Sequence, residues 1–555
     1  MLKTVFANRG YTSDFLSSIE QQSDDKLFNI GDLSAELRTI YENGDRLVVL
    51  PDFDMDGIMS GVVGFAGFAE LGFNVSLYIP KPSNGYGFGP GDIDKIVEQY
   101  PDVKAIITCD VGMSCDKGVS YGRSLGLKML VTDHHKLSLS KLVDADCIVN
   151  PMSPDDPCSF KGICGATVLY ECLCDYAERY CDTMVQDQIR RLKVFAGIGT
   201  ISDVMPLHHE NRELVRDCVS FCRLLYSNGN PWFLGALTGC EVYLRAFNGL
   251  FVALNMFGEL GKISGSDGID ETFFGFYLAP TFNSVKRVSG DMVHAFGVFF
   301  GNDPSGDMGE LIAMNDRRKA LVKEYMKKLG EVEQKYAPYV YISDAPAGIL
   351  GLIATACMKD SGMPTIVVNE IDGHYSGSGR SPSWYPVLSI FASKGFSFAG
   401  HEGAFGASFA NEEMISEFVD IVQSTVDEYL VSVRREEHVP DFTIALDGSG
   451  DSGLDIPLFA EFISDLDKYR PFGEGFPEPE IVFNFKASDG KWTRMGKLKQ
   501  HLKITFDRGF EVICWNQGND NFDGDDYVVT GRLSINTYND KYSINLIGKI
   551  ARRDA

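Results

Sequence analysis

Five short runs of apolar, largely β-branched residues near the start of the chain most limit how it can fold. They are RLVVLP (46–51), NVSLYIP (74–80), KAIITCD (104–110), KMLVTD (128–133) and DCIVNP (146–151). Each run is nearly continuously apolar, as in parallel strands that helices cover on both faces. Helix-length segments such as IMSGVVGFAGFAELG (58–72) and KGVSYGRSLG (117–126) separate the runs. This alternation predicts an α/β protein with a doubly wound parallel sheet.

The remainder of the chain divides into three further regions. The pattern becomes helical up to about residue 335, and a second α/β region then contains VYISD (340–344) and TIVVNE (365–370). Short alternating strands with turn signals fill the last hundred residues and predict a small β-barrel. We therefore predict an N-terminal segment with the first sheet (1–215), a helical connector (216–335), a smaller α/β domain (336–432) and a β-domain (440–555). The charged segment VRREEHVPDF (433–442) is predicted to be a linker.

Composition narrows the class of protein. No segment approaches the roughly 18 apolar residues of a membrane span, and the N-terminus lacks the pattern of a signal peptide. The 13 cysteines are scattered without CxxC or zinc spacing, which predicts reduced cysteines in a cytoplasmic protein, or in a host's cytoplasm if a phage encodes it. The net charge of −26 argues against loose adhesion to nucleic acid over the whole surface, although it permits a local basic groove.

Acidic and imidazole side chains follow three of the predicted strands. Asp52, Asp54 and Asp56 come after the first run, Asp110 ends the third, and the fourth is followed by Asp133, His134 and His135. The carboxyl ends of parallel strands lie at one edge of a sheet, so these groups are expected to meet there. Crowded carboxylates repel one another unless cations hold them. Oxygen and imidazole ligands suit Mn²⁺ or Mg²⁺, and two such ions would suit phosphoester hydrolysis.

Three other interpretations of these residues are weaker. An EF-hand loop needs flanking helices and a glutamate where Val63 stands. A dinucleotide-binding loop would carry glycines in place of the aspartates. His134 and His135 could be structural, although two adjacent histidines after a strand rarely both pack in a core.

Four motifs, in their order and spacing, resemble those of the DHH phosphoesterase superfamily. They are DFDMDG (52–57), CDVGMS (109–114), TDHH (132–135) and GTISDVMPL (199–207). FANRGYTSDF (6–15) and LAPTFNSVKR (278–287) extend the resemblance to the RecJ-type single-strand-specific exonucleases. GSGRS (377–381) and AGHEGAFGASF (399–409) resemble the DHHA1 domain, and KYRPFGEGFPEPEIVF (468–483) with GKLKQHLKITF (496–506) resembles the RecJ OB-fold region. The resemblance therefore covers nearly the whole chain.

The resemblance implies roles for individual residues. The metal ligands it implies are Asp52, Asp54, Asp56, Asp110, His134 and Asp203. It places His135 near the scissile phosphate, with Asp133 orienting the neighbouring groups and Asp110 bridging two ions. Substrate phosphate would be held by Arg380, Ser381, His401 and Lys81. Single-stranded DNA would follow a basic and aromatic surface of the OB-like domain near Trp492 and Trp515, formed by Lys497, Lys499, His501 and Lys503.

Two departures from the family pattern bear on metal and phosphate binding, whereas a third, Ala399 in place of a glycine, is mild. Leu50 stands where many relatives have histidine or tyrosine, which predicts a thinner shell around one ion. Lys81 is the only cation in the segment IPKPSNGYGFG (79–89), where relatives carry an arginine, so recognition of a 5′ phosphate is expected to be weaker.

The resemblance implies a metal-dependent exonuclease that degrades single-stranded DNA from 5′ to 3′ in recombination or repair. A monomer is expected, with a single-strand-binding protein or a helicase as candidate partners and no membrane. One alternative is a DHH phosphodiesterase for short oligonucleotides or cyclic dinucleotides, although such proteins lack the C-terminal OB-like region. The other is an inactive replication scaffold similar to Cdc45, although such proteins lose motif acids that this chain retains.

Overall fold

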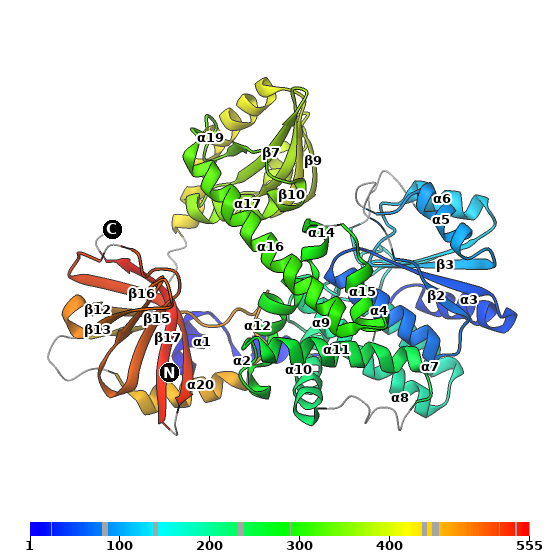
Figure 1. Cartoon of the computed structure of the whole chain (residues 1–555), viewed down its shortest axis with the longest axis horizontal. Coiled ribbons are helices and arrows are strands. Elements are labelled where there is room, and N and C mark those ends of the chain that lie inside the picture. Colours follow the sequence, from blue (N-terminus) through cyan, green and yellow to red (C-terminus); the bar gives the residue numbers. More distant parts are fainter. Residues whose placement is uncertain are drawn as a thin grey trace. The chain divides into compact units, whose positions relative to one another are not determined.

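The computed structural model divides into two compact units, each built from segments distant in sequence (Figure 1). One comprises Asp24–Met205 and Asp217–Glu437, and the other Met1–Ser23, Pro206–Arg216 and His438–Ala555. The structure describes residues 1–23, 25–79, 81, 87–136, 143–229, 238–288, 290–435, 441–446, 454–520, 522–538 and 541–553. Among these residues no helix is long and apolar enough to cross a membrane. All 13 cysteines are unpaired.

The predicted parallel sheet forms at the start of the larger unit. Its strands are β1 (Arg46–Pro51), β2 (Val75–Leu77), β3 (Val103–Cys109), β4 (Lys128–Thr132) and β5 (Cys147–Val149). Every neighbouring pair is parallel, and the order is β2-β1-β3-β4-β5. This is the order of a doubly wound α/β sheet, so the predicted fold class is confirmed.

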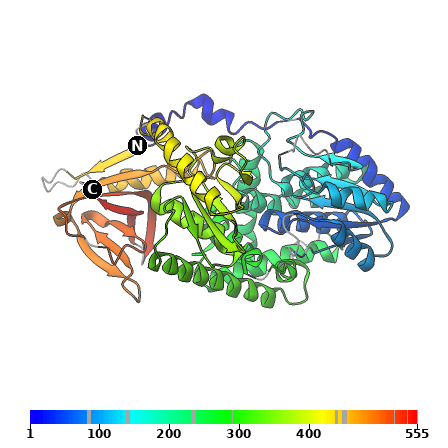
Figure 2. The ribbon, with the colours of Figure 1, turned by 90° about the horizontal axis from the view of Figure 1, so that it is seen from above.

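Helices cover both faces of this sheet, which explains the unbroken apolar runs. Val48, Leu50 and Ile106 pack with Ile93 of α5 (Pro90–Gln99) and Val119 of α6 (Asp116–Ser124). The opposite face is covered by α4 (Met55–Glu70) and α7 (Gly165–Tyr180), and Figure 2 shows helices on either side of the strands. Both faces of each strand are therefore buried, as parallel sheets require.

Helices fill the region between the two sheets of the larger unit. The first are α8 (Thr183–Arg191), α9 (Lys193–Ser202), α10 (Glu210–Asn228) and α11 (Glu241–Glu259), whereas α3 (Ile30–Asn43) precedes the first sheet and packs on α7 and β5. They are followed by α12 (Glu271–Phe273), α13 (Ala279–Phe282), α14 (Ser284–Val288), α15 (Val293–Phe300) and the long α16 (Pro304–Glu331). The predicted helical connector is thus helical where the structure describes it.

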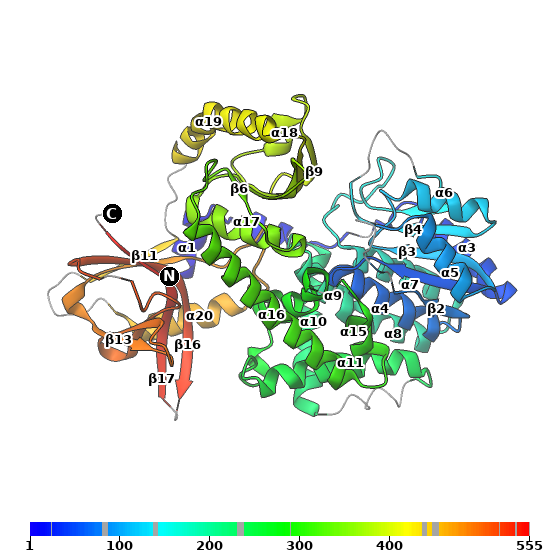
Figure 3. The same cartoon turned by 45° about the horizontal axis from the view of Figure 1, so that its top comes forward.

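The second sheet is mixed, with the order β6-β7-β8-β10-β9. Its strands are β6 (Val340–Ile342), β7 (Thr365–Ile371), β8 (His374–Arg380), β9 (Ser397–His401) and β10 (Ala404–Phe409). Val367 packs toward α17 (Ala347–Ser361), whereas Ile366 and Val368 pack with Phe418 of α19 (Glu412–Arg435). The two helices therefore lie on opposite faces of the sheet, as Figure 3 shows. The short α18 (Val387–Phe391) precedes β9.

The smaller unit is built on a seven-stranded sheet with the order β11-β12-β16-β17-β15-β14-β13. Its strands are β11 (Phe442–Ala445), β12 (Ile481–Lys486), β13 (Lys491–Met495), β14 (His501–Thr505), β15 (Phe510–Cys514), β16 (Asp526–Tyr538) and β17 (Lys541–Arg552). The helices α1 (Leu2–Asn8), α2 (Ser13–Ser18) and α20 (Ile456–Asp467) contribute Val5, Phe6 and Phe459 to its core or pack against it.

The structure differs from the predicted boundaries in three places. Met1–Ser23 and Pro206–Arg216 group with the C-terminal β-sheet instead of the first sheet. For Met1–Ser23, the reason is a set of contacts between residues more than 400 positions apart, including Arg9 Nη2 with Asp441 Oδ2 at 2.6 Å. The predicted linker begins inside α19, which continues to Arg435, and residues 436–440 lie outside the described part of the chain.

Candidate metal centre

The acidic and imidazole residues of the first sheet meet at the carboxyl ends of β1, β3 and β4. Asp52, Asp110 and Asp133 each continue the ladder by one residue, because their amides donate to the carbonyls of Cys109, Thr132 and Val149 at 3.1, 3.0 and 3.2 Å. Asp110 then adopts a left-handed backbone conformation, with φ of 63°. The chain therefore turns sharply where the carboxylate leaves the strand.

Asp54 begins α4 as its N-cap. Its Oδ1 accepts the amides of Asp56 and Gly57 at 3.1 and 3.2 Å. Asn283 Oδ1 accepts the amide of Met55 at 3.0 Å, and Lys286 Nζ lies 3.1 Å from Asp54 Oδ2. Asn283 and Lys286 belong to the segment LAPTFNSVKR of the predicted resemblance, but their contact with the start of α4 was not predicted, because more than 220 residues separate them from it in the chain.

Asp56 is held by the N-terminus of α7. Its Oδ2 and Oδ1 accept the amides of Gly165 and Ala166 at 2.7 and 3.2 Å. A Cβ atom on Gly165 would lie 2.4 Å from Asp110 Cβ, and one on Gly199 would lie 2.4 Å from Asp56 Oδ1. Two glycines from different helices thus allow close approach to the carboxylates, a role that only the tertiary structure reveals.

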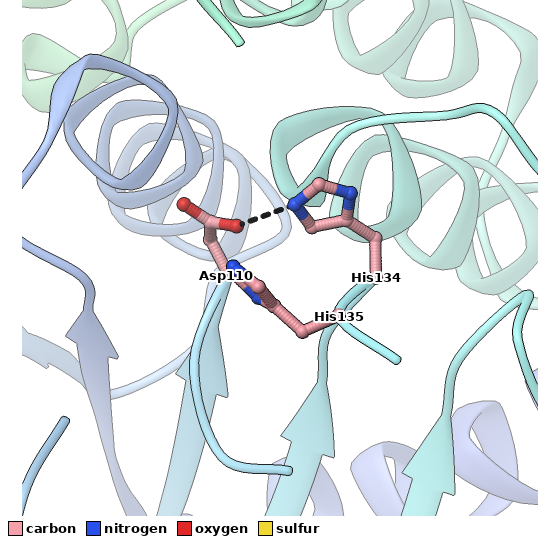
Figure 4. Close-up of side chains that lie close together, drawn as sticks. All are labelled: Asp110, His134 and His135. Atoms are coloured by element: carbon pink, nitrogen blue, oxygen red, sulfur yellow. Dashed lines mark ion pairs between the residues drawn. The ribbon is translucent and has the colours of Figure 1, made fainter. Parts of the chain in front are cut away.

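His134 lies among three carboxylates. Its Nε2 is 3.2 Å from Asp110 Oδ1, 3.5 Å from Asp203 Oδ2 and 3.9 Å from Asp56 Oδ2. Asp203 caps the C-terminus of α9 and reaches the cluster from outside the sheet. Figure 4 shows His134 pointing toward Asp110, with His135 beside them. The four sequence motifs therefore converge on one point.

Asp133 accepts hydrogen bonds from His135 and from the surrounding backbone. Its Oδ1 lies 2.7 Å from His135 Nδ1 and accepts the amides of His134 and His135, while Oδ2 accepts the amide of Met113 at 2.9 Å. Burial opposes ionisation of Asp133, but these contacts lower its pKa. The same hydrogen bond and charge outweigh burial at His135 and raise its pKa to about 9. The two residues therefore form an ion pair in which Asp133 fixes the imidazole orientation.

The donor set fits divalent cations. Ligand atoms of Asp52, Asp54 and Asp110 lie within 4.8 Å of one another, and so do those of Asp56, His134 and Asp203. A third group of this kind joins Asp110 to His134 and His135. Among the residues that the structure describes, none donates a hydrogen bond to the buried Oδ1 atoms of Asp52 and Asp110. Asp110 is shared by two groups, which is the geometry that a bridging carboxylate would need.

The electrostatics of the cluster also favour bound cations. Burial and the charge of Asp54 raise the pKa of Asp52 to about 8, and burial with Asp56 and Asp54 raises that of Asp203 to about 8. Burial and the surrounding aspartates raise the pKa of Asp110 well above its usual range. Burial also raises the pKa of Asp56, and it lowers that of His134. Carboxylates crowded in this way carry protons at neutral pH unless metal ions replace them.

Three arginines of the same unit gather next to this cluster. Burial and the charges of Arg380 and Arg318 lower the pKa of Arg287, which also experiences the charge of Asp54. Arg287 Nη1 donates to Gly348 O at 3.2 Å, Arg380 Nη1 to Gly379 O at 2.7 Å, and Arg318 Nε to Asn315 Oδ1 at 3.1 Å. Within the described residues no carboxylate forms an ion pair with any of the three. We call Arg287, Arg318 and Arg380 the arginine cluster; only Arg380 was predicted from sequence.

The other predicted phosphate ligands differ in how they are placed. Ser381 is buried and its hydroxyl donates to Tyr385 O at 2.7 Å, so this side chain supports the backbone. His401 ends β9, and burial together with the charges of His135 and Lys136 lowers its pKa, which places it near the histidines. Lys81 is exposed, and residues 80 and 82–86 around it lie outside the described part of the chain.

Leu50 does not face the carboxylates. It is 1% exposed and packs with Val48, Ile93 and Val119 in the core on the opposite side of the backbone from Val49. Strand alternation explains this, since residues 48 and 50 share one face of the sheet.

Some of the predicted DNA-binding residues of the smaller unit are exposed, and others are held by contacts within the unit. Lys497 and Lys499 are exposed between β13 and β14, and Trp515 is 55% exposed with its ring against His501 at 4.8 Å. Lys503 Nζ instead pairs with Glu511 Oε1 at 2.6 Å. Trp492 is partly buried against the core and donates Nε1–H to Ala487 O.

Comparisons with known proteins identify two regions of the chain. Residues 46–197 match the N-terminal domain of the DHH family, and residues 457–549 match the RecJ OB domain. The chain is 26% identical to the single-stranded-DNA-specific exonuclease RecJ of Bacillus subtilis over 529 residues, which cover 91% of this chain and 61% of that protein. For the Haemophilus influenzae RecJ the identity is also 26%, covering 84% of this chain and 79% of the relative.

Solved structures agree with this result. The crystal structure of Thermus thermophilus RecJ in complex with Mn²⁺ aligns with a TM-score of 0.71 at 21% identity, covering all of this chain and 76% of that one. The fold and the carboxylate–imidazole cluster thus define a protein with a DHH domain. The additional OB domain and these relatives confirm the predicted resemblance to the RecJ type.

Proposed function

We propose that this chain is a metal-dependent nuclease that hydrolyses phosphodiester bonds of single-stranded DNA. The observation that carries the proposal is the convergence of Asp52, Asp54, Asp56, Asp110, His134 and Asp203 beside the arginine cluster. Acidic ligands would hold cations, and unpaired guanidinium groups would hold phosphate. The chain spans 61% of the length of the Bacillus subtilis relative.

In the proposed reaction, the six residues would hold two Mn²⁺ or Mg²⁺ ions, which would activate water and stabilise the leaving oxygen. Asp110 would contribute to both sites, because it groups with Asp52 and Asp54 and its Oδ1 also lies 3.2 Å from Nε2 of His134, which belongs to the group with Asp56 and Asp203. His135, held protonated by Asp133, would donate a hydrogen bond to a phosphate oxygen. The arginine cluster would hold the strand in register with the cleaved bond by charge-assisted hydrogen bonds.

The proposed function includes a direction of degradation, a DNA-binding surface, protein partners and a cellular location. We infer degradation from 5′ to 3′ from the resemblance of the sequence motifs to the RecJ type, and the arginine cluster would hold a terminal phosphate. Trp515 and the exposed Lys497 and Lys499 support binding of single-stranded DNA in the OB domain. A role in recombination or repair in the cytoplasm, as a monomer with a single-strand-binding protein or helicase as partner, completes the proposal.

The experiment uses one single-stranded DNA oligonucleotide labelled at the 5′ end or at the 3′ end in separate reactions. Wild type and Asp110→Asn are compared with Mn²⁺ and with EDTA. Early release of the 5′ label as a mononucleotide, in wild type with metal only, supports the proposal. If the 3′ label leaves first, the proposed polarity is wrong.

Two further outcomes separate the alternative functions. Survival of long DNA with cleavage of dinucleotides or cyclic dinucleotides would move the assignment to a phosphodiesterase of short substrates. Absence of cleavage with either metal would favour an inactive scaffold, which the retained motif acids argue against.

A further inference from the structure

Lys286 contacts the oxygen of Asp54 that does not cap α4. Asp54 Oδ1 already accepts the two amides of the α4 N-terminus, from Asp56 and Gly57. Its other oxygen, Oδ2, lies 3.1 Å from Lys286 Nζ. A metal ion bound by Oδ2 would therefore meet an ammonium group of the same sign at the same atom.

The backbone that carries Lys286 is anchored to the start of α4. Three residues earlier, Asn283 accepts the amide of Met55, so two contacts join this segment to the beginning of α4. The charge of the ammonium also acts on Asp52 and Asp203. The side chains of Lys286 and Asp54 are 21% and 29% exposed, which leaves the lysine room to rotate away.

We propose that Lys286 is a positioning residue that takes the place of a cation at Asp54 and competes with the metal ion that the proposed function requires there. Before an ion binds, the ammonium neutralises Asp54 and holds Oδ2 toward the cluster. When an ion binds, Lys286 releases Asp54, and its charge becomes available to a substrate phosphate on the arginine-cluster side. Lys286 therefore weakens metal binding in the absence of substrate.

The test measures Mn²⁺ binding to the full chain by titration calorimetry without DNA, so it does not depend on activity. Lys286→Met removes the charge and the donor, whereas Lys286→Gln removes the charge but keeps a donor for Asp54. Lys286→Arg keeps the charge. Lys319→Met is the matched control, because Lys319 Nζ pairs with Asp316 Oδ1 at the same 3.1 Å on the exposed side of α16.

Loss of one nearby positive charge should tighten the weaker Mn²⁺ site roughly five- to tenfold in both neutral variants. Lys286→Arg and Lys319→Met should bind as wild type does. The neutral variants should also gain more thermal stability from Mn²⁺ than wild type does. If Lys286→Met folds poorly, both measurements can still be made on Lys286→Gln, which keeps a hydrogen-bond donor for Asp54.

Two results would overturn the inference, and they are distinguishable. Equal or weaker Mn²⁺ binding in both neutral variants would show that Lys286 does not compete with the ion, while the metal centre itself would stand. Wild type that binds no Mn²⁺ would overturn the metal centre of the proposed function, and this inference with it.

Discussion

Asp133 Oδ1 lies 2.7 Å from His135 Nδ1 and accepts the backbone amides of both histidines. One carboxylate thus sets the orientation of an imidazole and of the loop that carries it. This pair lies at the edge of the ligand cluster, since a ring nitrogen of His135 falls within the group that includes Asp110 and His134.

Asp133→Asn should lower the pKa of His135 and slow catalysis. Asp133 raises the pKa of His135 to about 9 in the metal-free protein, so protonation persists until the pH exceeds that value. Without the carboxylate, the imidazole should lose its proton near its usual 6.5. Titration of the histidine NMR signals checks this shift. The nuclease rate should fall about 10- to 100-fold, as for other partners of metal-site histidines. A His135 signal that titrates identically in both proteins would contradict the assignment.

Metal removal should make stability depend on pH. The metal-free native state keeps protons on Asp52 and Asp203 up to a pKa of about 8, whereas the unfolded chain loses them near the ordinary value of 3.8. The native state therefore binds more protons in this window, and its free energy of unfolding falls as pH rises. Mn²⁺ should remove that loss, because it binds the ionised carboxylates.

The measurement is thermal unfolding with Mn²⁺ and with EDTA between pH about 5.5 and about 8.5, a range set by proton linkage. The difference in Tm between the two conditions should widen toward the higher pH. Curves that stay parallel across this range would show that the ion does not bind these carboxylates.

Asp110→Asn should abolish nuclease activity while stabilising the metal-free protein. Its carboxylate is buried among aspartates that all raise its pKa, so replacing it by a neutral amide relieves repulsion. The nuclease rate should fall at least about 100-fold, because a ligand shared by two metal groups is lost. Unfolding in EDTA at alkaline pH should occur at a higher Tm than in wild type. A lower Tm would mean that Asp110 has a structural role that outweighs its repulsion.

Arg212→Met should destabilise the smaller unit strongly. Arg212 is fully buried, pairs with Glu20 at 2.9 Å and donates to the carbonyls of Leu207, Tyr469 and Pro471. Removing it leaves these acceptors without a partner, which should cost about 3–5 kcal/mol. Limited proteolysis should then cut the segment before residue 23 earlier than in wild type.

Arg216→Met is the control for that prediction. Arg216 also pairs with Glu20, but its side chain is 38% exposed. Its loss should cost about 1 kcal/mol or less. If both variants unfold alike, burial of Arg212 is not what joins the three segments of this unit.

Trp515→Ala should weaken binding of single-stranded DNA without altering the metal centre. Its exposed indole is available for base stacking, which contributes about 1–3 kcal/mol per base. Fluorescence anisotropy with a labelled oligonucleotide measures the loss of affinity, and Mn²⁺ calorimetry should match wild type. Unchanged affinity for DNA would exclude Trp515 from the binding surface.

The apolar runs of the first sheet and the residues that follow them were enough to predict the parallel sheet and the place of its ligand residues. Unbroken apolar strands need helices on both faces, and parallel strands align their carboxyl ends, so Asp52, Asp110 and His134 could be placed together from sequence. The four motifs likewise identified Asp203, which α9 brings to the cluster.

Only the tertiary structure showed which distant residues complete the site and the units. Lys286 reaches Asp54 from α14, and the packing of α14 on α16 and α17 brings Arg287 toward Arg318 and Arg380; no periodicity in their own segments encodes these positions. The grouping of Met1–Ser23 with the C-terminal sheet has the same cause, since it depends on contacts such as Arg9 with Asp441. Local patterns determine the secondary structure, whereas packing between segments far apart in the chain decides which charges meet.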